Sequence, residues 1–254
     1  MERWGSWFRG RGCPGVPDSS GDADKALGEC DTDDGDASLP NASRIVYPLA
    51  VDAWNAVGEH LFEEQECGVA VRYARGQDRD RWIDVYFYPA GILSGDEFDD
   101  AARLEADLIR QAHEAAGYAG FEMGPPGRFS IDPMGGDATV EAIALDLQYD
   151  ADGTAYSSAM VLLLHDLYFV KARYSVARAT LTRAQTRNAL EAFVAQLRSQ
   201  LTIASVGAGW GDGVAFADRR KPGSSLREIR LDYGDAPADA IATSRHTRKD
   251  VLVA

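Results

Sequence analysis

The chain is poor in the residues from which most catalytic and metal sites are built. It has only four histidines and three cysteines among 254 residues. None of the histidines stands in an HExxH motif or beside a second ligand at zinc-site spacing. The sequence also contains neither a G-x-S-x-G nucleophile elbow nor a phosphate-binding P-loop. These absences predict a protein that holds no metal and no cofactor, and they favour a non-catalytic function.

Basic residues and long apolar runs are also scarce. The chain has 26 basic against 40 acidic residues, a formal net charge of −14 and a pI near 4.7. Because phosphate groups are bound by clustered lysine and arginine, we expect no nucleic-acid partner. We also expect no membrane insertion, since no run of 18 apolar residues is present.

Features of the N-terminus and the cysteines bear on the compartment. The opening stretch MERWGSWFRGRGCPG is positively charged but lacks the apolar core of a secretory signal. Cys13, Cys30 and Cys67 are odd in number and show no repeated spacing, so we expect unpaired thiols in a reducing compartment. Together these features predict a cytoplasmic protein, or a periplasmic one if the start is mis-assigned.

Composition divides the chain into three parts. Residues 1–42 are rich in Asp, Gly and Ser, and we expect them to be disordered because they cannot bury enough apolar surface. Residues 43–205 form a single predicted domain, although the first stretch, 45–62, mixes helix and strand cues and is not assigned. Residues 206–254 read as a polar, flexible C-terminal tail, in which apolar residues near 226–231 could add one short strand.

The first half of the predicted domain is a hairpin followed by a helix. The segments 67–75 and 81–88 alternate as strands around the polar turn GQDRD. Ser94 or Asp96 is the expected N-cap of the helix, and Gly117 its C-terminal stop. The expected apolar stripe, which leaves His113 on the solvent side, consists of Phe98, Ala101, Leu104, Leu108, Ala112 and Ala115. The prolines and glycines of 122–137 predict an irregular loop.

The second half is a meander followed by a helix. Strands are expected at 141–149, 154–165 and 167–176, joined by tight turns. Thr182 and Gln185 form a predicted capping box. The apolar stripe of this helix is Ala189, Leu190, Phe193, Val194, Leu197 and Leu201.

The predicted fold is therefore α+β: an antiparallel β-sheet of about five to six strands, with element order β-β-α-β-β-β-α, flanked by two amphipathic helices. This order, together with the segments WIDVYFYPAG and LYFVKARYS, resembles the Mog1/PsbP-like fold group. The resemblance covers the middle of the chain. It implies binding and assembly proteins rather than enzymes, and it carries over no functional residue because no signature motif is involved.

The candidate binding site lies on two of the expected strands. In RWIDVYFYPAG, alternation places Trp82, Asp84, Tyr86 and Tyr88 on the side opposite the apolar residues of the same strand. These aromatic side chains are either core, covered by a helix, or a surface for a ligand, and we expect Tyr86 to be core. Lys171 and Arg173 make a small basic spot on a second strand, suited to an acidic partner or an anion.

Two functions follow from these residues. The first is a non-catalytic binding module, of the chaperone, adaptor or immunity type, that binds another protein through a sheet face or edge. The alternative is an enzyme whose site assembles near the 81–88 and 165–173 strands, from Asp84, Tyr86, His165 and Lys171. A deep pocket with converging polar groups would favour the enzyme, and an exposed patch on a filled core would favour binding.

Overall fold

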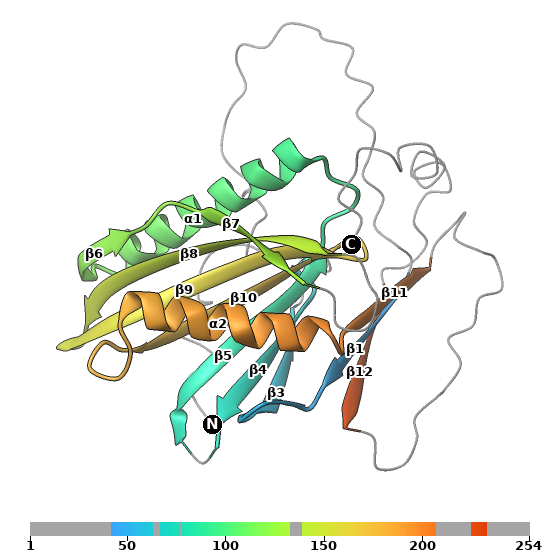
Figure 1. Ribbon diagram of the computed structural model, residues 1–254, viewed down its shortest axis with the longest axis horizontal. Coiled ribbons are helices and arrows are strands. Elements are labelled where there is room, and N and C mark those ends of the chain that lie inside the picture. The colour runs from blue at the N-terminus through green and yellow to red at the C-terminus, as the bar shows by residue number, and fades with distance from the viewer. Residues whose placement is uncertain (1–41, 63–66, 77, 133–138, 207–224, 233–254) are drawn as a thin grey trace, which may run out of the picture.

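The computed structural model describes residues 42–62, 67–76, 78–132, 139–206 and 225–232, which form an α+β fold with two helices and antiparallel sheets (Figure 1). The helices are α1 (Gly95–Ala115) and α2 (Arg183–Arg198). The strands are β1 (Ala42–Pro48), β2 (Ala50–Val51), β3 (Trp54–Leu61), β4 (Val69–Arg75), β5 (Asp78–Pro89), β6 (Ala119–Met123), β7 (Gly127–Ile131), β8 (Val140–Ala151), β9 (Thr154–His165), β10 (Tyr168–Ala177), β11 (Thr202–Val206) and β12 (Leu226–Asp232).

The main sheet has nine strands, in the order β2-β3-β4-β5-β10-β9-β8-β6, with β7 also paired to β8. Its centre is the meander β8-β9-β10, and the hairpin β4-β5 joins it through an antiparallel β5·β10 ladder. Strand β9 separates a core cluster that contains Leu162 from one that contains Val161 and Leu163. Because neighbouring residues of a strand point to opposite faces, the sheet is buried on both sides, as the continuous apolar run in β9 predicted.

The helices cover opposite faces of this sheet. Cluster residues from α2, such as Phe193 and Leu197, pack with Val161, while cluster residues from α1, such as Phe98 and Ile109, pack with Leu162. Helix α2 runs across the sheet in the view of Figure 1, and α1 lies beyond β8. Both helices begin with a full capping box, formed by Ser94 with Glu97 and by Thr182 with Gln185, so these predicted starts are confirmed.

A small second sheet, ordered β11-β1-β12, packs on the side of the main sheet that α2 covers. Ile45 and Ile203 extend the same core cluster as α2, and the Tyr73 hydroxyl of β4 donates to the Pro48 carbonyl at 2.7 Å. Strand β12 lies inside the segment for which the sequence predicts a tail, and its pairing with β1 joins residues 226–232 to the folded unit. The rest of that segment, and residues 1–41, lie outside the described residues.

The strand number is larger than the sequence predicted. The unassigned stretch 45–62 forms β1, β2 and β3, and β11 follows α2. The supposed irregular loop contains part of β6 and all of β7, which pair with different parts of β8. Pro125 and Pro126 fall between these two strands, so the prolines mark a break between strands rather than excluding them.

The buried face of α1 is rotated relative to the predicted stripe. Leu104 is 36% exposed, whereas His113, expected on the solvent side, is 1% exposed. The buried residues are Phe98, Ala102, Glu105, Ala106, Ile109 and His113. The predicted stripe was wrong because it treated polar residues as outward-facing, and two of them have partners inside the protein.

His113 is held in an aromatic cluster. Its Nδ1–H donates to the Ile109 carbonyl at 2.7 Å, and its ring centroid lies 4.6 Å from that of Tyr149 and 4.9 Å from that of Phe121. Burial disfavours the charged imidazolium and lowers the pKa of His113 from 6.5 to about 4. The stability that this residue contributes is therefore complete above pH 6.5 and is lost as the pH falls toward 4, because only the unfolded chain takes up the proton there.

We expect His113→Phe to reduce the acid sensitivity of the fold. Between pH 7 and pH 4.5 the free energy of unfolding of the wild type should fall by roughly 2–3 kcal/mol more than that of the variant, a difference that follows from the lowered pKa. Urea denaturation of both proteins at the two pH values measures it. Parallel losses in the two proteins would show that His113 is not buried in its neutral form.

Candidate functional site

The six residues predicted for a binding site come together on the α1 face of the sheet. In the β5·β10 ladder, Tyr86 is opposite Lys171 and Asp84 is opposite Arg173. Tyr86, Tyr88 and Lys171 are 8%, 3% and 5% exposed. The two tyrosines are therefore core residues, as expected for Tyr86. Trp82, Asp84 and Arg173 are only partly buried, so the face changes from core to surface along β5 and β10.

The buried part of this face is organised by a charged pair. Lys171 Nζ lies 2.7 Å from Glu105 Oε2, with the two side chains 6% and 3% exposed. The other carboxylate oxygen of Glu105 accepts a hydrogen bond from the Tyr88 hydroxyl. The ammonium also lies 5.3 Å from the ring centroid of Tyr86 and 5.8 Å from that of Tyr88. The pair thus connects α1 to both β10 and β5.

These contacts change the protonation of the groups involved. Burial lowers the pKa of Lys171 below its usual value, and the nearby Glu105 carboxylate acts against this by favouring the ammonium. Burial also raises the pKa of Tyr88, and the hydrogen bond to Glu105 holds the proton further in place. The ammonium, the carboxylate and the neutral phenol therefore satisfy one another, which is what burial of such groups requires.

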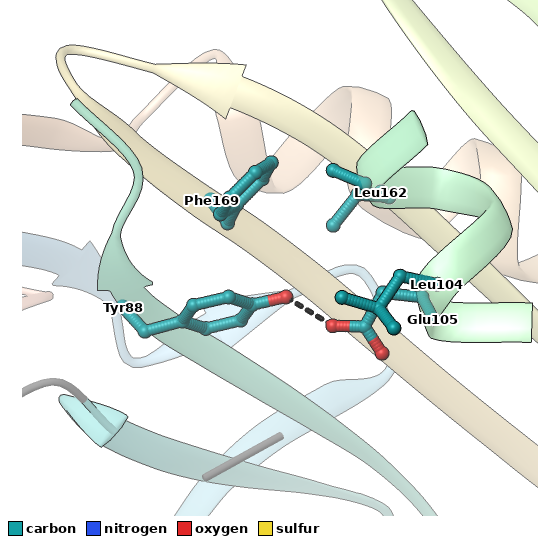
Figure 2. A pocket seen from close by; sticks show the side chains of 6 residues that line it. Tyr88, Leu104, Glu105, Leu162 and Phe169 are labelled. Atoms are coloured by element: carbon teal, nitrogen blue, oxygen red, sulfur yellow. Dashed lines mark hydrogen bonds between the residues drawn. The ribbon is translucent and has the colours of Figure 1, made fainter. Parts of the chain in front are cut away.

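A small cavity lies beside this pair (Figure 2). It holds about 20 Å³ and is lined by Tyr88, Ala101, Leu104, Glu105, Leu162 and Phe169. In Figure 2 the Tyr88 hydroxyl points at Glu105, with Leu162 and Phe169 on the other side of the space. A volume of this size accommodates about one water molecule. Ligand pockets are typically of the order of 300–1,000 Å³, so this space does not suit an organic substrate.

The partly buried part of the face is also built on a charged pair, Arg72 and Asp84, whose side chains are 15% and 13% exposed. Arg72 of β4 donates from Nε to Asp84 Oδ1 at 2.6 Å and from Nη2 to Oδ2 at 2.8 Å, which engages both carboxylate oxygens. Its guanidinium carbon lies 4.9 Å from the centroid of the Trp82 ring. Arg173 lies beside this pair on β10. We call Arg72, Trp82, Asp84 and Arg173 the open sector.

The apolar cluster under helix α1 does not include Trp82. The apolar cluster around α1 is built from β8 and β9 with flanking residues such as Phe169 and Tyr118, and it includes no described residue of β3 or β4. All four residues of the open sector keep part of their surface accessible. The second face of the opening strand is therefore covered by α1 near Tyr88 and left accessible to solvent near Trp82.

The four residues of the enzyme hypothesis are not brought together. Asp84, Tyr86 and Lys171 share the α1 face of the sheet. His165 lies two residues after Leu163 on β9 and therefore points, like Leu163, to the α2 face. The sheet thus separates the imidazole from the other three groups. Within the described residues no group of three or more His, Cys, Asp and Glu side chains is placed to hold a metal ion. Neither described helix is long and apolar enough to cross a membrane.

Cys67 departs from the expectation of unpaired thiols. It is 1% exposed and disulfide-bonded, while Cys13 and Cys30 lie outside the described residues. The odd cysteine count misled because one pair among three cysteines leaves one over. Next to it, Gly68 has a φ of +63°, and a Cβ there would lie 1.9 Å from the Phe87 carbonyl oxygen. The start of β4 is therefore fixed closely against β5.

Sequence reasoning missed two residues of the site. Neither Glu105 nor Arg72 was among the predicted site residues. The available signal for Glu105 was Lys171, a lysine in a strand whose neighbours Val170 and Ala172 are core residues. A cation in such a strand requires a buried partner, and α1 supplies acidic residues. For Arg72 the signal was its position opposite Asp84 in the hairpin register.

Comparison with known proteins gives a limited result. No protein-family model matches the chain, and no curated protein matches it. The chain is similar to LpqN of Mycobacterium tuberculosis, a protein involved in cell envelope biogenesis, with 13% identity, a TM-score of 0.35, and coverage of 65% of this chain and 86% of that one. It is also similar to the cyanobacterial PsbP protein of Synechocystis sp. PCC 6803, with 11% identity, a TM-score of 0.38, and coverage of 70% and 99%.

A PsbP protein is thus among the similar structures. With TM-scores under 0.5, neither likeness bears on function. The architecture of the chain is a mostly antiparallel sheet with two helices.

We expect the Lys171–Glu105 pair to be strongly coupled. Lys171→Met should destabilise the fold by about 3–5 kcal/mol, because it leaves a buried carboxylate without its cation. Adding Glu105→Gln should recover at least half of that loss, since the neutral amide oxygen still accepts from Tyr88. Urea denaturation of the single and double variants gives the coupling free energy.

The matched control is the pair Arg187–Glu191 on α2, whose side chains are 26% and 24% exposed at an N···O distance of 2.7 Å. Arg187→Met should cost less than about 1 kcal/mol. Equal costs for Lys171→Met and Arg187→Met would contradict the buried role of the Lys171–Glu105 pair.

Proposed function

We propose that this protein is a non-catalytic binding module that engages another protein through the open sector. The main support for the proposal is the environment of Trp82. This residue is partly exposed, its ring lies under the guanidinium of Arg72, and it does not belong to the apolar cluster under α1. Tryptophan and arginine are the residue types that most often carry the binding energy of protein interfaces. Their position on paired strands holds them rigid, which lowers the entropy lost on binding.

The polar groups near this surface support binding over catalysis. Asp84 has both oxygens engaged by Arg72, and Lys171 has its charge matched by Glu105, so neither is poised as a base or a nucleophile. The cavity of about 20 Å³ beside Glu105 leaves no room for an organic substrate.

The disulfide bears on where the protein acts. A disulfide persists in an oxidising compartment and is rare in the reducing cytoplasm. The bond at Cys67 therefore favours the periplasmic or extracellular alternative over the cytoplasmic one, and our proposal places the protein outside the reducing cytoplasm.

Trapping of thiols in the native cells tests this placement. Cells are quenched in acid, and the proteins are unfolded and alkylated before any reductant is added, because Cys67 is buried in the folded state. Mass spectrometry should find Cys67 unalkylated, and alkylated only after reduction. Full alkylation of Cys67 before reduction would argue for a reducing compartment.

Site-specific photo-crosslinking tests the binding surface. Benzoylphenylalanine in place of Trp82 should give a covalent adduct with another protein when the native cells are irradiated, because the open sector lies against the partner. The matched control is position 188, since Asn188 is exposed on α2, on the opposite side of the sheet. Absence of an adduct at 82, or equal adducts at both positions, would refute the proposed surface.

A further inference from the structure

In contrast to several arginines of the fold, Arg173 has no anionic partner among the described residues. Arg128, Arg183 and Arg187, for example, each lie within 3.5 Å of a carboxylate oxygen. Arg173 makes no ion pair with the described residues, and its buried Nε has no hydrogen-bond partner among them. The carboxylate nearest to it in the register, Asp84, is taken by Arg72.

The charge around Arg173 is also unbalanced. Among the described side chains that β4, β5 and β10 place on this face, Arg72, Lys171 and Arg173 are cations and Asp84 is an anion. Helix α1 adds the carboxylate of Glu105, so these described side chains leave one positive charge over. Burial is the main cause of the lowered pKa values of Lys171 and His113, and the positive charge of Arg173 adds to the lowering in both. In a chain of net charge −14 this surplus is local, and it favours an anion at this place.

The shape of the open sector indicates which anion fits. Arg173 is partly buried through its Nε, so its remaining guanidinium nitrogens form the part that solvent reaches. The two Nη groups of a planar guanidinium can donate to both oxygens of a carboxylate, and Arg72 engages Asp84 next to it in a bidentate way through its other edge, Nε and Nη2. Because the guanidinium has already lost part of its hydration, a carboxylate displaces less water there than at an exposed arginine.

We infer that Arg173 is a binding site for a carboxylate carried by an acidic segment of the partner protein. The inference rests on the proposed function, because it names the chemistry by which the open sector recognises its partner. The Trp82 ring lies against Arg72 on the β4 side of β5, and it supplies an apolar surface within the same open sector.

Hexaglutamate is the probe for this site, and hexaglutamine, of equal length without charge, is its control. In ¹H–¹⁵N spectra that observe arginine side chains, hexaglutamate should shift the Arg173 Nε–Hε signal, which is assigned by its loss in Arg173→Gln. Hexaglutamine should leave it in place. Sodium acetate at the same carboxylate concentration should give a smaller shift, because it lacks the neighbouring residues of a chain. An acetate shift as large as that of hexaglutamate would overturn the assignment to an acidic segment.

Arginine variants distinguish a specific carboxylate site at Arg173 from nonspecific electrostatic attraction. Arg173→Gln should weaken hexaglutamate binding about tenfold or more. Arg173→Lys should weaken it by an intermediate factor, because the positive charge remains but the paired N–H donors of the guanidinium are lost. The matched control is Arg103→Gln, which removes the same charge from an exposed position on α1. It should change binding less than about twofold. Arg173→Lys also keeps the test valid should Arg173→Gln fail to fold.

The inference is overturned if hexaglutamate does not shift the wild-type signal, or if Arg173→Gln and Arg103→Gln weaken binding equally. Its failure is distinguishable from failure of the proposed function. The photo-adduct at position 82 reports whether a protein sits on the open sector at all, whereas the dependence of hexaglutamate binding on Arg173 reports only the carboxylate chemistry.

Discussion

The buried pair of Lys171 and Glu105 is the constraint on which the arrangement of the α1 side depends. A lysine placed in the middle of a core strand would be strongly unfavourable unless an anion met it, and only a helix laid across the sheet in a particular rotation brings Glu105 to within 2.7 Å. That rotation turns Leu104 outward and His113 inward. Apolar packing alone would favour the stripe that contains Leu104, so the charged pair decides which face of α1 is buried.

Local sequence patterns determine how much of the fold could be predicted. The hairpin, the meander, both helices and their capping boxes follow from local patterns of period 2 and 3.6, and the structure contains them. Strands β1, β6 and β11 could not be predicted in this way, because short strands are stabilised by their partners, such as β8 for β6, and not by a pattern of their own.

The candidate site could be predicted only in part, because alternation within a strand is local whereas contacts between elements are not. Alternation along β5 correctly put Trp82 and Tyr86 on one side of their strand, and alternation along β10 did the same for Lys171 and Arg173. That these two groups share a face follows from the β5·β10 ladder, which the sequence did not predict. Glu105 was not predictable, since its burial depends on contacts between elements 66 residues apart in sequence. Whether an aromatic residue on this face is core or surface depends likewise on where α1 ends over the sheet.

Two charged pairs on one face then have different consequences. Lys171 and Glu105 are sealed under α1 and neutralise each other, so they fix the helix and offer nothing to a partner. Arg72 and Asp84 also neutralise each other, but they lie outside the apolar cluster under α1. Because each carboxylate is matched to one cation, the third cation, Arg173, cannot be satisfied by either pair. Among the described residues, the pairing that stabilises the α1 face therefore leaves Arg173 without an anionic partner, on the strand next to Asp84.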